Sequence, residues 1–271
     1  MTTTHTLDVP GARLHYEVRG TGPLLLITGA PMGVGGFAMF ADAMSDDHTV
    51  VTHDPRGIGA SRLDDPDQDS TPDLRADDLA ALLDALGAES ADVFGSSGGA
   101  VTALALATRH PARVRTVLAH EPPLLQLLPD APRQNVAVEE MVETCRRDGP
   151  MAAIAQFTRW AGFEEGDEGA PVPQGELTER DLADVTRFYL HEIRHTTRYQ
   201  PDLAALRDGP VRVEVGVGTE SARLMTYQAS VRLTELLGRP PVVFPGDHGG
   251  FIGRPKEFAE VLRTLLEQGR R

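Results

Sequence analysis

The chain has 271 residues, 41% of them hydrophobic and 24% charged, with a formal net charge of −14. This length suits one large α/β domain or two small ones. The acidic balance argues against nucleic acid, which needs a basic surface, and no apolar stretch approaches the roughly 20 residues of a membrane span. Residues 1–10 lack the basic start of a signal peptide, and arginine far outnumbers lysine. We therefore expect a soluble, cytoplasmic protein from a bacterium with a GC-rich genome.

Strand-like and helical patterns alternate along most of the chain. Short apolar or alternating runs predict strands at residues 11–19, 23–28, 48–53, 91–94, 114–119, 211–217 and 241–244. Helical patterns lie between them at residues 74–86, 98–109, 223–237 and 255–268. This alternation predicts an α/β fold whose mostly parallel sheet carries helices on both faces.

One region, residues 122–206, interrupts the alternation. It contains no strand-like run, and helical patterns occur at residues 136–147, 151–160 and 177–196. The acidic, Gly/Pro-containing stretch 164–176 is predicted to be a mobile loop. We expect a helical insertion lying over the sheet, with aromatic side chains such as Phe157 and Trp160 facing a substrate. The alternative is that these aromatic residues only form the core of the insertion.

A Gly-x-Ser-x-Gly motif follows the strand predicted at residues 91–94. In the segment Gly95–Gly99, the glycines allow a sharp turn from a strand into a helix, where larger side chains would clash. Such a turn exposes the Ser97 hydroxyl at the C-terminal edge of the sheet, close to a helix N-terminus that favours negative charge. Ser97 is therefore the predicted nucleophile, and Ser96 would replace it only if the turn were shifted by one residue.

A serine hydroxyl becomes an effective nucleophile only when a neighbouring base removes its proton. Of the nine histidines, His248 lies directly after the last predicted strand, in the glycine-containing segment 245–251. It would therefore also lie at the C-terminal edge of the sheet. A serine followed later in the chain by its histidine is a known order for a catalytic triad, so we predict His248 as the general base.

With these residues, the chain resembles the capped branch of the α/β-hydrolase superfamily over nearly its whole length. The resemblance rests on Thr28-Gly29-Ala30-Pro31, Asp54-Pro55-Arg56-Gly57-Ile58-Gly59-Ala60-Ser61, Gly95–Gly99 and Gly246-Asp247-His248-Gly249, which occur in the family's order. It implies an α/β-hydrolase core at residues 1–121 and 207–271, with a helical cap inserted at residues 122–206. It also implies Ser97 as nucleophile and His248 as general base.

The resemblance further implies an oxyanion hole made by the backbone N–H groups of Ala30 and Gly98. Family members often have a histidine where this chain has Thr28. Because the hole uses backbone donors, we expect it to function with a different loop packing. The glycines of the Asp54–Ser61 loop, with Asp54 and Arg56, are expected to brace the loops around the site without taking part in the chemistry.

Two carboxylates compete for the third place in the triad. Most of the superfamily has an acid after the penultimate core strand, where this chain has Ser221 at the expected position and Glu220 beside it. A second placement in the superfamily, after the strand that follows the nucleophile helix, is occupied by Glu121. A carboxylate between a buried strand and two prolines needs a partner, so we favour Glu121 and keep Glu220 as the alternative acid. A third interpretation pairs Glu121 with a neighbouring arginine and gives it no catalytic role.

The run His191–His195 matches the His-Glu-x-x-His pattern of zinc proteases. A metalloprotease needs a third ligand downstream on a supporting fold, and here the pattern lies inside the insertion of another type of enzyme. We therefore predict no metal and no cofactor.

These features predict a serine hydrolase that cleaves a carboxylic ester or related small acyl compound through an acyl-enzyme, on a triad of Ser97, His248 and Glu121. A serine nucleophile disfavours the dehalogenase and epoxide-hydrolase branches, which use aspartate. Thioester, lactone, amide and C–C bond cleavage stay open, as does perhydrolase activity. The alternative is a ligand-binding or biosynthetic protein, such as a cyclase or lyase, on the same scaffold. The sequence gives no indication of oligomeric state.

Overall fold

A long mixed β-sheet forms the centre of the computed structural model, which describes residues 1–170 and 177–269. In this described part the sheet has nine strands, in the order β1-β2-β4-β3-β6-β7-β8-β9, with β5 beside β2. The strands are β1 (Thr3–Val9), β2 (Ala12–Arg19), β3 (Leu24–Thr28), β4 (Thr49–His53), β5 (Arg62–Leu63), β6 (Ala91–Ser96), β7 (Val114–His120), β8 (Arg212–Gly218) and β9 (Val242–Phe244). The pairs that involve β2 are antiparallel, and all pairs from β4 to β9 are parallel. The predicted, mostly parallel sheet is confirmed.

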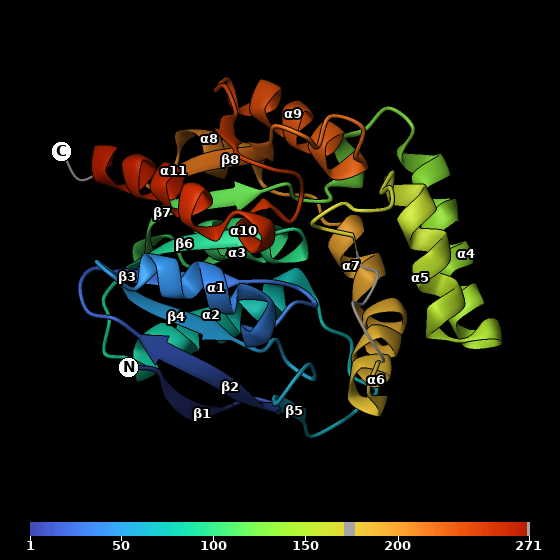
Figure 1. Ribbon diagram of the computed structural model, residues 1–271, viewed down its shortest axis with the longest axis horizontal. Coiled ribbons are helices and arrows are strands. Elements are labelled where there is room, and N and C mark those ends of the chain that lie inside the picture. The colour runs from blue at the N-terminus through green and yellow to red at the C-terminus, as the bar shows by residue number, and fades with distance from the viewer. Residues whose placement is uncertain (171–176, 270–271) are drawn as a thin grey trace.

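Helices cover both faces of this sheet (Figure 1). Successive side chains of a strand point to opposite faces. Leu25 and Ile27 of β3 belong to an apolar cluster that includes residues of α1 and α11, whereas Leu26 belongs to a second cluster that includes residues of α2, α3 and α9. These helices are α1 (Val34–Met44), α2 (Pro72–Ala85), α3 (Gly98–Arg109), α9 (Met225–Leu237) and α11 (Pro255–Gln268), and the short helix α10 (Gly250–Gly253) precedes α11. The central strands are therefore buried on both sides, which explains their continuous apolar runs.

Between β7 and β8 the described chain forms helices and no strand, and these helices lie beyond one edge of the sheet (Figure 1). They are α4 (Ala131–Asp148), α5 (Pro150–Ala161), α6 (Glu179–Arg187), a π-helical turn (Phe188–Glu192) and α7 (Ile193–Thr197). They share an apolar cluster, distinct from those of the sheet, which includes Val138, Met141 and Tyr189 and is joined by Met225 of α9. The next helix, α8 (Leu203–Asp208), crosses the predicted boundary at residue 206, and its Leu206 packs with the sheet cluster instead.

Several elements differ from the prediction for identifiable reasons. β1 was not expected, because it is an edge strand with mostly exposed, polar residues and carries no apolar run. α1 was not expected either, since Gly35 and Gly36 weaken the helical pattern at its start. The single helix predicted at residues 177–196 is divided by the π-helical turn. Of the loop predicted at residues 164–176, residues 164–170 contain neither helix nor strand, and residues 171–176 lie outside the described residues.

None of the helices in the described part of the chain combines the length and the apolar character needed to cross a bilayer.

Candidate active site

Ser97 occupies a sharp turn between β6 and α3. Its backbone has φ 55° and ψ −123°, a conformation that costs a non-glycine residue on the order of 1–3 kcal/mol. Its N–H donates to the carbonyl of His120, at 2.9 Å, which holds the turn against the neighbouring strand. A Cβ at Gly95 or Gly99 would collide with backbone atoms, so the glycines of the motif are required by close packing. The turn expected from the Gly-x-Ser-x-Gly motif is present, with Ser97 at its centre.

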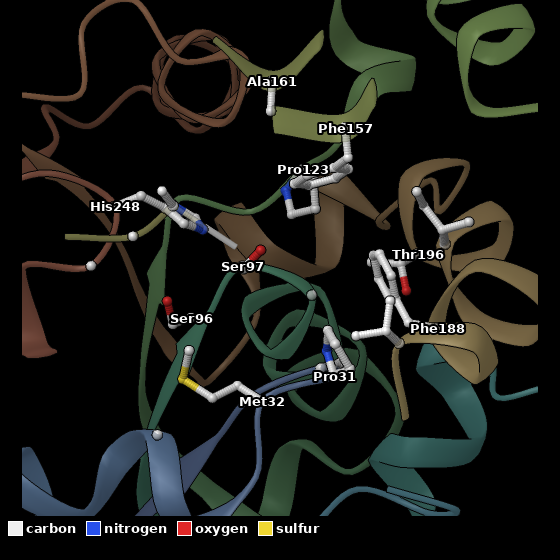
Figure 2. Close-up of a pocket in the computed structure, with 18 of the residues that line it drawn as sticks. Pro31, Met32, Ser96, Ser97, Pro123, Phe157, Ala161, Phe188, Thr196 and His248 are labelled. Carbon is white, nitrogen blue, oxygen red and sulfur yellow. The ribbon is translucent and has the colours of Figure 1, made fainter. Parts of the chain in front are cut away.

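His248 lies in the loop between β9 and α10, and its imidazole points toward Ser97 (Figure 2). Gly246, with φ +85°, allows the chain to turn back just before it. The Nδ1 atom of His248 lies 2.7 Å from Oε2 of Glu121. Since a neutral imidazole carries one proton, a proton held on Nδ1 by the carboxylate leaves Nε2 free to accept one.

Glu121 directly follows β7 and is fully buried. Its Oε1 accepts the N–H of Gly218 at 2.8 Å, and its Oε2 accepts the hydroxyl of Thr226 at 3.1 Å in addition to contacting His248. Burial by itself would raise the pKa of this carboxyl. The hydrogen bond from His248 and the charge that this imidazole carries when protonated, with smaller effects of His120 and the N–H of Gly218, outweigh burial and lower the pKa to about 2. Glu121 is thus a charged acceptor behind His248, and its titratable hydrogen-bond partner is this histidine.

Glu220 takes a different position. Its side chain is 53% exposed and forms an ion pair with Arg254, with 2.8 Å between Oε1 and Nη2. Ser221, at the family's usual acid position, is buried and contributes no carboxylate. Of the two carboxylates considered from the sequence, the structure therefore brings Glu121 to His248.

Two backbone donors lie beside Ser97. Ala30 follows β3 and Gly98 begins α3, and both line the same cavity as Ser97. Within the described residues, neither N–H donates a backbone hydrogen bond. A Cβ added at Gly98 would lie only 2.5 Å from the carbonyl oxygen of Ala30, so the absence of a side chain permits this close approach. Two unpaired donors next to a serine hydroxyl are able to stabilise negative charge on a substrate oxygen.

A cavity of about 540 Å³ opens over Ser97. Phe157 and Ala161 lie on one side of Ser97, and Pro31 and Met32 on the other (Figure 2). Its wall also includes Trp160, Phe163, Phe188 and Tyr189 from the chain between β7 and β8. The indole N–H of Trp160 donates to Oε1 of Gln134 at 2.8 Å, which fixes the ring. Both aromatic residues singled out from the sequence, Phe157 and Trp160, line this cavity.

Thr226 was missed by the sequence reasoning. Its hydroxyl lies 3.1 Å from Oε2 of Glu121 and 3.5 Å from Nδ1 of His248, at the start of α9. Threonine in the first turn of a helix is common, so its pattern carries no functional signal. Thr226 reaches the carboxylate of Glu121 only because α9 packs against the end of β7, which the sequence does not show.

The residues of the His-Glu-x-x-His pattern do not converge. His191 and His195 each contact one carboxylate oxygen of Asp69, at 3.0 Å. Glu192 is buried on the opposite side, about 4 Å from Arg75 and Arg187. Among the described residues, no cluster of three or more histidine, cysteine or carboxylate side chains is suited to a metal ion.

The Asp54–Ser61 loop makes bracing contacts. Asp54 accepts the N–H groups of Val34 and Ala60 at 2.9 and 2.7 Å. Arg56 binds both carboxylate oxygens of Asp78, and both side chains are buried. These bonds tie the loops on one side of the cavity to α2.

A family model described as the alpha/beta hydrolase fold matches residues 22–163. The uncharacterized hydrolase YraK of Bacillus subtilis is 35% identical over 268 residues, which cover 97% of this chain and 96% of that protein. A zearalenone hydrolase of Cladophialophora bantiana is 36% identical, over 94% of this chain and 93% of that protein. A thermophilic esterase from Thermogutta terrifontis has a similar fold, with a TM-score of 0.74 at 22% identity and 100% of both chains covered. The resemblance to the α/β-hydrolase superfamily is thereby confirmed, and this chain belongs to that superfamily and is a hydrolase.

Proposed function

We propose that this hydrolase cleaves neutral carboxylic esters, lactones or related acyl compounds, with Ser97 as nucleophile, His248 as general base and Glu121 as the acid of the triad. The observation that carries this proposal is the 2.7 Å contact between Nδ1 of His248 and the buried carboxylate of Glu121, behind a serine in a strained turn.

In this mechanism, Oγ of Ser97 attacks the carbonyl carbon of the substrate while Nε2 of His248 accepts the hydroxyl proton. The carbonyl oxygen becomes negative and faces the N–H groups of Ala30 and Gly98. Glu121 stabilises the imidazolium that forms. The C–O bond of the ester then breaks, and the alcohol leaves with the proton from Nε2. A water molecule, deprotonated by His248, attacks the acyl-enzyme in the same way and releases the acid and Ser97.

The cavity wall favours a neutral, apolar substrate. Most of its side chains are aliphatic or aromatic, and no lysine or arginine is among the described residues that line it. A substrate carboxylate would therefore find no cationic partner there, while the carboxylates of Asp181 and Asp184 in the same wall would repel it. Because the relative from Cladophialophora bantiana is named a zearalenone hydrolase, zearalenone is one candidate substrate to be tested.

The proposal also includes the division of the chain into a core and a cap, which the sequence predicts at residues 1–121 and 207–271 and at residues 122–206, with the second boundary moved toward the N-terminus. The separate apolar cluster of α4, α5 and the π-helical turn supports an independent cap. The packing of Leu203 and Leu206 with the sheet cluster favours a boundary just before α8.

The test is reaction with a fluorophosphonate probe followed by intact mass, together with turnover of p-nitrophenyl esters of increasing chain length and of zearalenone. We expect one adduct on Ser97 and hydrolysis of at least one ester, both absent in Ser97→Ala. A folded wild-type protein that is neither labelled nor active would refute the proposal and favour the ligand-binding or biosynthetic alternative.

A further inference from the structure

The segment 164–170, which follows α5, lies directly against the loop that carries His248. A Cβ added at Gly169 would lie 2.8 Å from Cβ of His248 and 2.5 Å from the backbone nitrogen of Gly249. Just before the segment, the ring of Phe163 contacts the His248 imidazole edge to face, with 5.9 Å between ring centres. The segment therefore forms the wall of the cavity next to the general base.

Asp247, the residue before His248, is buried and holds this segment through its carboxylate. Oδ2 accepts the N–H of Glu168 at 2.7 Å, and Oδ1 accepts those of Gly169 and Gly249 at 3.1 and 2.7 Å. The Asp247 side chain thus joins the backbone of the segment to the backbone of Gly249, the residue after His248. Charge-assisted bonds of this kind are about twice as strong as those between neutral groups.

Glu168 makes the reciprocal contact from the segment to the His248 loop. A Cβ at Gly246 would lie 2.5 Å from its Oε2, and a Cβ at Gly253 would collide with its carboxylate, so these two glycines form a cradle around it. Nε of Arg254, the residue directly after α10, lies 3.3 Å from Oε1 of Glu168. The carboxylate of Glu168 is thus inserted between the residues that flank His248.

We propose that Asp247 and Glu168 are positioning residues that form a reciprocal clasp, fixing the segment 164–170 to the His248 loop and thereby holding the imidazole between Ser97 and Glu121. This inference rests on the proposed function, since it assigns the clasp an effect on the reaction. Ser97 and Glu121 are attached directly to strands, whereas His248 lies on a loop that needs other restraints. A misplacement of about 1 Å in a reacting group costs about 10²-fold in rate.

The tests are Asp247→Asn, Glu168→Gln and the double variant. An asparagine has one carbonyl oxygen and one NH₂ group, so it leaves at least one of the three N–H groups without an acceptor. Glu164→Gln is the matched control, because it removes the same charge from the same segment. The Glu164 side chain is 74% exposed, and its ion pair, with 3.8 Å to Arg223, does not involve the His248 loop.

The readouts are kcat and KM for a p-nitrophenyl ester, the rate of fluorophosphonate labelling, and amide hydrogen exchange. We expect Asp247→Asn to lower kcat and the labelling rate together by about 10- to 100-fold, with KM changed less than threefold. Glu168→Gln should lower kcat and the labelling rate by about 3- to 10-fold. The double variant should lose less activity than the product of the two single-variant fold losses, because both changes break the same clasp. Glu164→Gln should stay within twofold of wild type.

Hydrogen exchange separates the clasp from the proposed function. The clasp requires faster exchange of residues 245–250 in Glu168→Gln and of residues 164–170 in Asp247→Asn. Unchanged exchange in both variants, or unchanged kcat and labelling in folded variants, would overturn the inference. If Asp247→Asn does not fold, Glu168→Gln alone decides by the same criteria. A wild-type protein without labelling or turnover would refute the proposed function and the clasp's effect on the reaction, while exchange would still show whether the clasp exists.

Discussion

Glu121→Gln keeps the size of the side chain behind His248 but removes its charge. The pKa of Glu121 is about 2, compared with an ordinary value of 4.5, and this difference corresponds to about 3 kcal/mol in favour of the charged form. Burial opposes this shift, and the hydrogen bond and charge of His248 are the largest causes that lower the pKa, ahead of His120 and the N–H of Gly218. In the proposed mechanism the imidazolium of His248 forms in the transition state, so losing its charged partner should lower kcat by at least 10². The corresponding loss in a serine-protease triad, about 10⁴, is an upper guide.

The assay compares kcat of Glu121→Gln, Glu220→Gln and wild type at the pH optimum, with circular dichroism to confirm folding. Glu220→Gln is the matched control, since its carboxylate binds Arg254 and is half exposed, and it should cost less than about tenfold. A collapse of kcat in Glu220→Gln with Glu121→Gln near wild type would reverse the assignment. Near-normal rates in both variants would show that neither carboxylate completes the triad.

Three further outcomes follow from the same structure. Ser97→Ala should abolish turnover, by several orders of magnitude in kcat, while thermal unfolding stays close to wild type. Phe157→Ala and Trp160→Ala should lower kcat/KM for esters with long acyl chains, by an amount equivalent to about 1–3 kcal/mol of lost binding, and barely change kcat/KM for the acetate ester. An equal loss on all esters would indicate misfolding. Burial lowers the pKa of both His53 and His120 to about 4. As the pH falls below 6.5, these two histidines bind protons in the unfolded state before they do so in the folded state. The free energy of unfolding, measured with urea, should therefore have its full value above pH 6.5 and fall by a few kcal/mol per histidine as the pH drops to 4.

The sequence predicts those parts of the fold whose residues carry a strong local signal. Strands buried on both faces have continuous apolar runs, and α3 and α11 have the predicted bounds because glycine or proline marks their ends. Edge strand β1 has no such signal, since its pairing with β2 involves backbone groups and its side chains are mostly exposed. The same reasoning applies to Ser97, whose glycines are required by the turn itself.

The site residues could be predicted where the turn geometry, the position after a strand or the cost of a buried charge restricts the residue type. Glu121 was favoured because a charge between a buried strand and prolines needs a partner, but its partner lies 127 residues away in the chain. Thr226 belongs to no local pattern, and the motif that contains Asp247 gives no indication of what its carboxylate binds. Their contacts depend on how α9 and the segment 164–170 pack against the end of the sheet, which is a property of the whole fold.

Ser97 and Glu121 are the two non-glycine residues with positive φ in the described chain, at 55° and 48°. Both follow strands that pair directly, with Ser96 opposite His120 in the register. Each turn is held by a bond to the adjacent strand: Ser97 N–H to His120, and Glu121 N–H to Gly216. Backbone strain of about 1–3 kcal/mol at each residue is therefore offset by the sheet itself. This arrangement returns both side chains to one edge, so the sheet register sets the separation of the proposed nucleophile and acid. The proposed base, His248, lies on a loop and must be held by contacts outside the sheet.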